Sequence, residues 1–61
     1  MPLVIVKMLE GRSAEQKSSL AREITDVVVK NTGTTADQVD VVIEDYAREN
    51  WAKGGVLFKD K

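Results

Sequence analysis

The residues that most constrain the fold are Leu3 to Met8, an apolar and mostly β-branched run that follows a proline at position 2. Branched side chains suit the pleated surface of a sheet, so this run predicts a β-strand. Side chains alternate along a strand, which places Leu3 and Ile5 on one face and Val4, Val6 and Met8 on the other. Because both faces are apolar, we expect this strand to be covered on both sides.

The chain has 61 residues, which indicates one domain spanning residues 1–61 with a small core. Domains of this size are commonly stabilised by disulfides, a metal or oligomerisation. The sequence contains no Cys and no His, so disulfides and the common zinc ligands are excluded and oligomerisation is the expected solution. We expect no cofactor and no metal.

The charges favour a small-molecule partner over nucleic acid or membrane. Nine basic and ten acidic residues are interspersed along the chain, giving a net charge of −1, and no basic patch suited to nucleic acid is present. No apolar run approaches the roughly 20 residues of a membrane span, and no basic and apolar leader opens the chain. We expect a cytoplasmic protein.

A helix is predicted to follow the first strand. Ser13 has the features of an N-cap, and Gln16 three residues later completes a capping box. Gly33 is expected to end the helix as a left-handed residue, just after Asn31 and Thr32. Between these ends, apolar residues recur at helical spacing and form one stripe: Leu20, Ala21, Ile24, Val27 and Val28. One stripe implies that the helix covers one face of a sheet.

A second strand is predicted over Val39–Asp45, after a short helical turn that begins near Thr35. A strand, a helix of about five turns and a strand form a β-α-β unit, whose strands pair in parallel. Near the C-terminus, Gly54-Gly55 between short apolar runs predicts a hairpin. The predicted class is therefore α/β, with a parallel strand pair and a short C-terminal hairpin that packs on a neighbouring subunit.

Four residues are candidates for a functional site, and each has a simpler explanation. Pro2 is sterically acceptable at the start of any strand. Arg12, next to a helix start, is either a solvated cation or an anion-binding residue. Trp51 is either buried area or part of a site, and Asp40 is either a solvated carboxylate or a group that contacts a ligand. No single residue identifies a function.

Taken together, these residues closely resemble 4-oxalocrotonate tautomerase and its small relatives along essentially the whole chain. The resemblance rests on Pro2, an aromatic residue at position 51, the glycine pair, and the segment Met8-Leu9-Glu10-Gly11-Arg12-Ser13 with Glu15-Gln16-Lys17. It implies dimers by sheet pairing and hexamers. It also implies removal of Met1, so that the Pro2 amine acts as the general base for keto–enol tautomerisation of 2-keto acids.

The same resemblance gives roles to two further residues. Arg12 matches the arginine that holds the distal carboxylate of the substrate, and Trp51 stands where the family has a phenylalanine that makes the site apolar. An ordinary α-amino group has a pKa near ~8. Burial and a neighbouring cation such as Arg12 would lower the pKa of the Pro2 amine toward neutrality.

Asp40 departs from the family pattern, because it stands where the family has a second arginine that engages the substrate carboxylate beside the keto or enol oxygen. We favour the interpretation of Asp40 as a solvated carboxylate over that of an acid or base that assists Pro2. In the expected site it opposes a dicarboxylate unless Arg48 or Lys53 compensates. The leading hypothesis is a tautomerase of enolisable 2-keto acids. The alternatives are a non-catalytic oligomer with the same fold and a related hydratase or dehalogenase.

Overall fold

The structure, a computed structural model, describes all 61 residues of the chain. It contains one α-helix, four strands and three short 3-10 helices, and the 3-10 helices are labelled η. In chain order they are β1 (Leu3–Leu9), α1 (Ala14–Thr32), η1 (Ala36–Gln38), β2 (Asp40–Tyr46), η2 (Arg48–Asn50), β3 (Ala52–Lys53), β4 (Val56–Leu57) and η3 (Phe58–Asp60).

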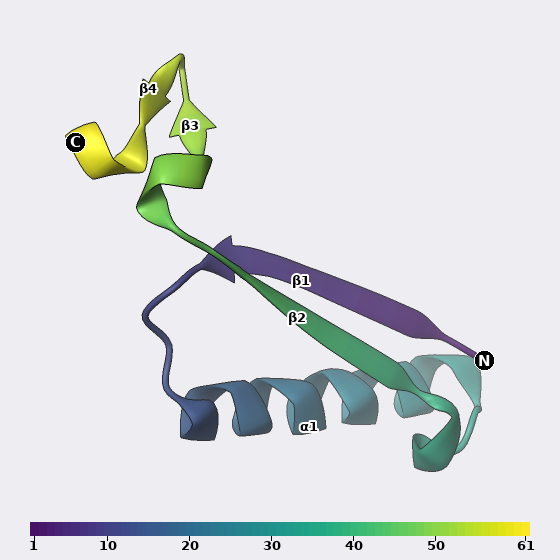
Figure 1. The fold of residues 1–61 in the computed structure, drawn as a ribbon. Helices are drawn as coiled ribbons and strands as arrows, with labels where there is room; N and C mark the ends of the chain where they lie inside the picture. Colours follow the sequence, from purple (N-terminus) through teal and green to yellow (C-terminus); the bar gives the residue numbers. More distant parts are fainter.

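The strands β1 and β2 form a two-stranded parallel sheet, and α1 is the crossover between them (Figure 1). The register runs from Leu3 opposite Asp40 to Leu9 opposite Tyr46. The chain therefore has the α/β architecture, the parallel strand pair and the C-terminal hairpin that the sequence predicts.

The two ends of α1 have the predicted caps. The Ser13 Oγ accepts the backbone N–H of Gln16 at 3.1 Å, and the Gln16 side chain accepts the backbone N–H of Ser13 at 2.9 Å. Gly33 adopts φ 75°, a left-handed conformation in which a Cβ is costly, and its N–H donates to the Val29 carbonyl. The helix therefore starts and stops where local hydrogen bonding dictates.

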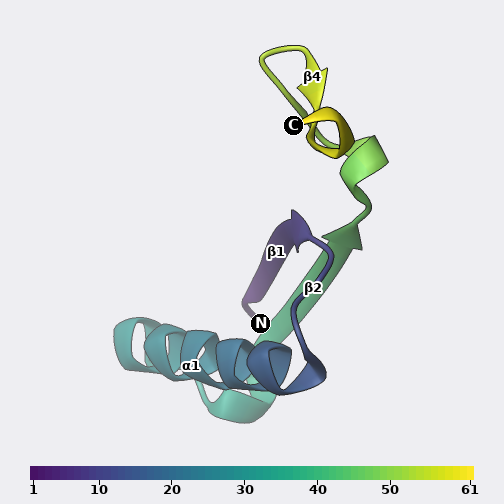
Figure 2. The ribbon, with the colours of Figure 1, turned by 90° about the vertical axis from the view of Figure 1, so that its left-hand side faces the viewer.

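The helix covers only one face of the sheet (Figure 2). The covered face carries Val4 and Val6, which are half-buried, while Leu3, Ile5 and Val42 on the opposite face are 57%, 50% and 42% exposed. No residue of the chain is fully buried. Within one chain β1 is therefore covered on one side only, because a single helix cannot reach both faces, and the expected second cover stays a prediction that requires another copy.

The second strand begins one residue later than predicted, at Asp40. The N–H of Val39 donates to the Ala36 carbonyl and so closes η1, whereas the N–H of Asp40 is the first to join β1, through the Pro2 carbonyl. The helical turn near Thr35 is present, but the Thr35 side chain makes no capping hydrogen bond. Backbone pairing, and not side-chain pattern, sets this boundary.

Residues 47–61 form a tail that projects away from the sheet and helix (Figure 1). Gly54 and Gly55 have φ 63° and 84° and connect the antiparallel strands β3 and β4, a turn that requires positive φ at both central residues. The radius of gyration is 14.5 Å, compared with about 10 Å for a compact chain of this length. The chain is too extended to enclose a core by itself.

Candidate active site

Pro2 immediately precedes β1 and is half-buried. Its carbonyl accepts the backbone N–H of Asp40 at 2.9 Å, which fixes its position at the start of both strands. Its nitrogen is joined to Met1, whose residue surface is 91% exposed. While Met1 is attached, that nitrogen is an amide without a basic lone pair.

Asp40 is the first residue of β2 and lies opposite Leu3 in the parallel register. Paired residues of a sheet share a face, so Asp40 lies on the open face, opposite the side covered by α1. Its side chain is exposed and takes part in none of the ion pairs or hydrogen bonds of the chain. The structure therefore brings the backbones of Pro2 and Asp40 together, and the Asp40 carboxylate is unpaired on the open face.

Arg12 lies in the loop between β1 and α1, directly before the N-cap Ser13. Gly11 precedes it with φ 122°, a conformation that residues with a Cβ rarely adopt, so the loop requires glycine at this position. The Arg12 side chain is exposed and belongs to none of the three ion pairs. It is free to bind an anion.

Trp51 follows η2 and is half-buried within the tail. Its ring meets Tyr46 edge-to-face at 5.9 Å between centroids and stacks on Phe58 at 6.2 Å. The sequence analysis did not place Tyr46 or Phe58 beside Trp51. The signal was available, because the only three aromatic residues of the chain all lie between positions 46 and 58.

The hydroxyl of Tyr46 donates to Glu44 Oε1 at 2.8 Å. This hydrogen bond stabilises the protonated phenol and raises the pKa of Tyr46 above its ordinary value of 10.0, and desolvation adds to the shift. Tyr46 therefore remains neutral through the physiological range and links the end of β2 to the aromatic cluster of Tyr46, Trp51 and Phe58.

The four predicted site residues lie at two opposite ends of the sheet. Pro2 and Asp40 lie at the amino ends of the strands, whereas Arg12 and Trp51 follow their carboxyl ends. The strand β1 has seven residues, and at about 3.3 Å per residue it spans roughly 20 Å. Arg12 of the same chain is thus too distant to lower the pKa of the Pro2 amine, so its expected role stays a prediction that requires a second copy.

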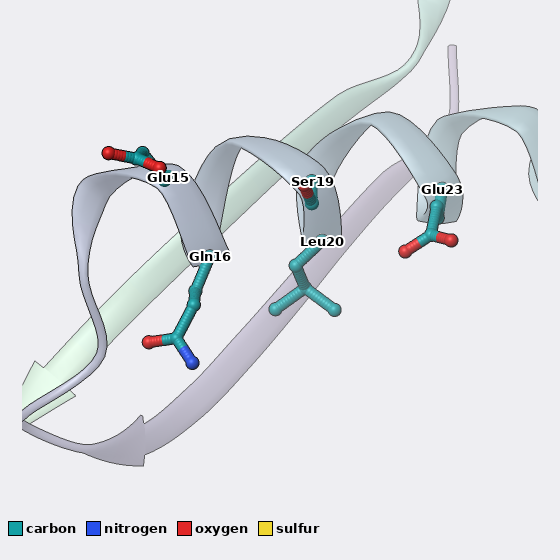
Figure 3. Close-up of a pocket in the computed structure, with 5 residues that line it drawn as sticks. All are labelled: Glu15, Gln16, Ser19, Leu20 and Glu23. Atoms are coloured by element: carbon teal, nitrogen blue, oxygen red, sulfur yellow. The ribbon is translucent and has the colours of Figure 1, made fainter.

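The hollows on the surface of the chain do not include these four residues. One lies along α1 and is lined by Glu15, Gln16, Ser19, Leu20 and Glu23, all from the helix (Figure 3). The other is an apolar groove between α1 and β1, lined by Val4, Glu23, Ile24, Val27 and Val28. A single chain therefore has no closed cavity around the predicted site.

The chain carries no group of three or more acidic side chains arranged to hold a metal ion. Its helix is also not long and apolar enough to cross a membrane.

A β-α-β unit with a parallel strand pair, a proline directly before the first strand, an arginine in the β1–α1 loop and a short hairpin arm define a distinct class of very small α/β proteins. The family model described as "Tautomerase enzyme" matches residues 2–61 of this chain. The chain belongs to the tautomerase family.

Individual relatives agree with this assignment. Proteins from Staphylococcus epidermidis and Bacillus cereus, each described as a "probable tautomerase", are 44% identical over 61 residues, covering the full length of both chains. A solved 4-oxalocrotonate tautomerase homologue is 39% identical with a TM-score of 0.95, covering 100% of this chain and 97% of the homologue. A heterohexameric 4-oxalocrotonate tautomerase from Chloroflexus aurantiacus is 32% identical with a TM-score of 0.92, covering 98% and 97% of the two chains.

Proposed function

We propose that this protein is a tautomerase that interconverts the enol and keto forms of 2-keto acids, with the amine of Pro2 as the general base after removal of Met1. The observation that carries this proposal is the position of Pro2 directly before β1, in a chain whose match to the tautomerase family begins at residue 2. Free of Met1, Pro2 carries a secondary amine at the start of an apolar strand.

The reaction needs one group that accepts a proton and returns it. The neutral Pro2 amine takes the hydroxyl proton of the enol, and the resulting ammonium gives a proton to the neighbouring carbon while the C–O bond becomes a carbonyl. Atoms and charge balance without a cofactor. Half-burial of Pro2 disfavours its charged form, which helps to keep the amine neutral at cellular pH.

The separation of the predicted residues supports a site built from more than one chain. Pro2 and Arg12 lie at opposite ends of a strand that spans roughly 20 Å, so one small substrate cannot contact both in the same chain. A complete site therefore requires Arg12 and the aromatic cluster of one copy to lie beside Pro2 of another. We propose a homo-oligomer, with a hexamer as the specific expectation.

Three features of the chain support this assembly. Leu3, Ile5 and Val42 leave an apolar face open, an apolar groove follows the helix beside β1, and the tail projects away from its own sheet. Each of these surfaces is of a kind that a second copy would cover. The oligomer is therefore part of the proposed function, because the site is incomplete without it.

The test compares the protein lacking Met1 with a variant that carries an uncleavable extension ahead of Pro2. Mass spectrometry verifies each N-terminus, and sedimentation verifies that both have the same oligomeric state. The trimmed protein should ketonise the enol of a 2-keto acid, and the extended protein should be inactive because its Pro2 nitrogen is an amide. Equal rates would show that Pro2 is not the base.

A retained Met1 in protein from the native host would favour the non-catalytic alternative. The proposed cytoplasmic location is tested separately by fractionation of that host.

A further inference from the structure

We infer that the ion pair between Lys17 and Asp45 positions Arg12 and holds it at the carboxyl end of the sheet, where its guanidinium can bind the distal carboxylate of the substrate. This inference rests on the proposed function and adds two positioning residues to the same site. Lys17 and Asp45 engage each other, so they act on the substrate through Arg12.

The ion pair crosses the interface between α1 and the sheet. Asp45 lies opposite Met8 in the register, and both residues lie on the face that α1 covers. The ammonium of Lys17, in the first turns of α1, contacts the Asp45 carboxylate, and the two side chains are 30% and 37% exposed. No other ion pair or side-chain hydrogen bond joins the helix to the sheet. Because apolar contact is non-directional, this pair fixes the start of the helix along the sheet.

The loop between β1 and α1 is anchored on β2 at both of its ends. At the first end, the N–H of Glu10 donates to the Tyr46 carbonyl at 2.9 Å. At the second end, the N–H of Lys17 donates to the Ser13 carbonyl at 3.1 Å, while the Lys17 side chain reaches Asp45. The two anchors are therefore adjacent residues of one strand, and the second anchor is the ion pair.

Arg12 lies between these anchors, and its exposed side chain forms no ion pair of its own. Its backbone position is thus set by the anchors at the end of β2. The same strand end carries the aromatic cluster, since Tyr46 meets Trp51 edge-to-face at 5.9 Å. Without the ion pair, the loop keeps only its first anchor. A guanidinium that must offer two parallel N–H donors to a carboxylate then loses its fixed geometry.

The size of the effect is limited by the contact that Arg12 makes. Loss of a hydrogen bond to a charged group weakens binding by about 10-fold to about 100-fold. Loss of the ion pair displaces the guanidinium without removing it, so we expect a change of about tenfold, no larger than that of Arg12→Gln. The contact is distant from the reacting carbon and is made in substrate and transition state alike, so KM should rise while kcat changes little.

The experiment uses two enols as probes: that of (4-carboxyphenyl)pyruvate, which has a distal carboxylate, and that of phenylpyruvate, which lacks it. We follow the loss of enol absorbance with protein that lacks Met1, and sedimentation verifies that all variants have the same oligomeric state. Lys17→Met and Asp45→Asn remove the ion pair, whereas Lys17→Arg preserves it. Arg22→Met is the matched control, because it removes a cation from an exposed position of α1. Arg12→Gln is measured alone and together with Lys17→Met.

We expect Lys17→Met and Asp45→Asn to raise KM for the diacid about tenfold and to leave KM for the monoacid nearly unchanged. Lys17→Arg and Arg22→Met should leave both values unchanged. With Arg12→Gln already present, Lys17→Met should have no further effect on KM, because both changes act through one contact. Fully additive effects, or equal effects on the two substrates, would indicate a merely structural role and overturn the inference.

A second measurement reports the position of the loop without turnover. The backbone order parameter of Arg12, measured by NMR relaxation, should fall from about 0.85 toward about 0.6 in Lys17→Met and stay unchanged in Arg22→Met. An unchanged value in Lys17→Met would overturn the inference, as would loss of the assembled fold in both Lys17→Met and Asp45→Asn. Turnover with an unaltered KM in Lys17→Met would overturn this inference alone. No turnover by the unmodified protein would overturn the proposed function as well.

Discussion

Replacing Ile5 by aspartate tests whether the open face of the sheet is the contact surface between copies. Ile5 lies at the centre of this face, opposite Val42 in the register, and half of its surface is exposed in one chain. The substitution adds a charge where the proposed assembly requires apolar contact. Ser18→Asp adds the same charge at an exposed position of α1 and is the matched control.

The magnitude follows from the exposed areas. The exposures of Leu3, Ile5 and Val42 together amount to about one and a half side chains, and covering them contributes roughly 2–4 kcal/mol per chain. Ile5→Asp loses about 1 kcal/mol of this and leaves an unpaired carboxylate between apolar surfaces, which costs several kcal/mol. A loss of at least about 3 kcal/mol per chain lowers an association constant more than about 100-fold.

Sedimentation velocity at micromolar concentration measures the outcome. We expect the unmodified protein and Ser18→Asp to sediment as one oligomer, and Ile5→Asp to move toward the 6.8 kDa of a single chain, with loss of helical circular dichroism where the isolated chain unfolds. A folded monomer of the unmodified protein would refute the reasoning. So would an Ile5→Asp variant whose mass equals that of the control.

Two further predictions concern local contacts. Ser13→Ala removes the hydroxyl that caps α1 and should lower the free energy of unfolding by about 1 kcal/mol, measured with urea at one fixed protein concentration; Ser18→Ala, a mid-helix control, should not lower it. Tyr46, the single tyrosine, should ionise at higher pH in the native protein than in urea, and Glu44→Ala but not Glu49→Ala should remove most of the difference in a spectrophotometric titration. Because the pKa of Tyr46 is raised on folding, its contribution to stability is complete below pH ~10 and is lost as pH rises through the native pKa.

The features that could be predicted from the sequence are those fixed by residues close together in the chain. Ser13 and Gln16 define the start of α1 because their two hydrogen bonds close within three residues. Gly33 defines its end because the left-handed conformation there disfavours a Cβ. Gly54 with Gly55 likewise specifies the hairpin turn. Each signal is local, so it keeps its meaning whatever surrounds the chain.

The arrangement of the site could not be derived in the same way. Pro2 and Arg12 are both recognisable in the sequence, but the strand between them holds them apart. Contacts between separate copies would produce no residue-spacing pattern that a single sequence could reveal. The start of β2 at Asp40 depended on which backbone N–H turns toward β1, a choice that the side-chain pattern of Val39 and Asp40 does not encode. The open face was predicted as an apolar surface, and no part of the chain itself covers it.

The contacts of the lysine side chains leave the Pro2 amine and the carboxylates, chiefly Asp40 and Glu10, as the candidate bases. The sequence offers no His or Cys. Three of the six lysines form ion pairs, Lys7 with Glu44, Lys17 with Asp45 and Lys59 with Asp60, and the ammonium of Lys61 lies over the Phe58 ring. The other two, Lys30 and Lys53, are exposed on the last turn of α1 and on the hairpin.

The dependence of kcat/KM on pH separates the amine from the carboxylates, because it follows the ionisation of the free enzyme. An amine base produces a rise toward pH ~8 or somewhat below, whereas carboxylates ordinarily ionise near pH ~4. A rise near neutrality that disappears when an extension is placed ahead of Pro2 assigns the base to the backbone amine. Activity that survives the extension and rises only at acidic pH assigns the base to a carboxylate, with Asp40 as the leading candidate.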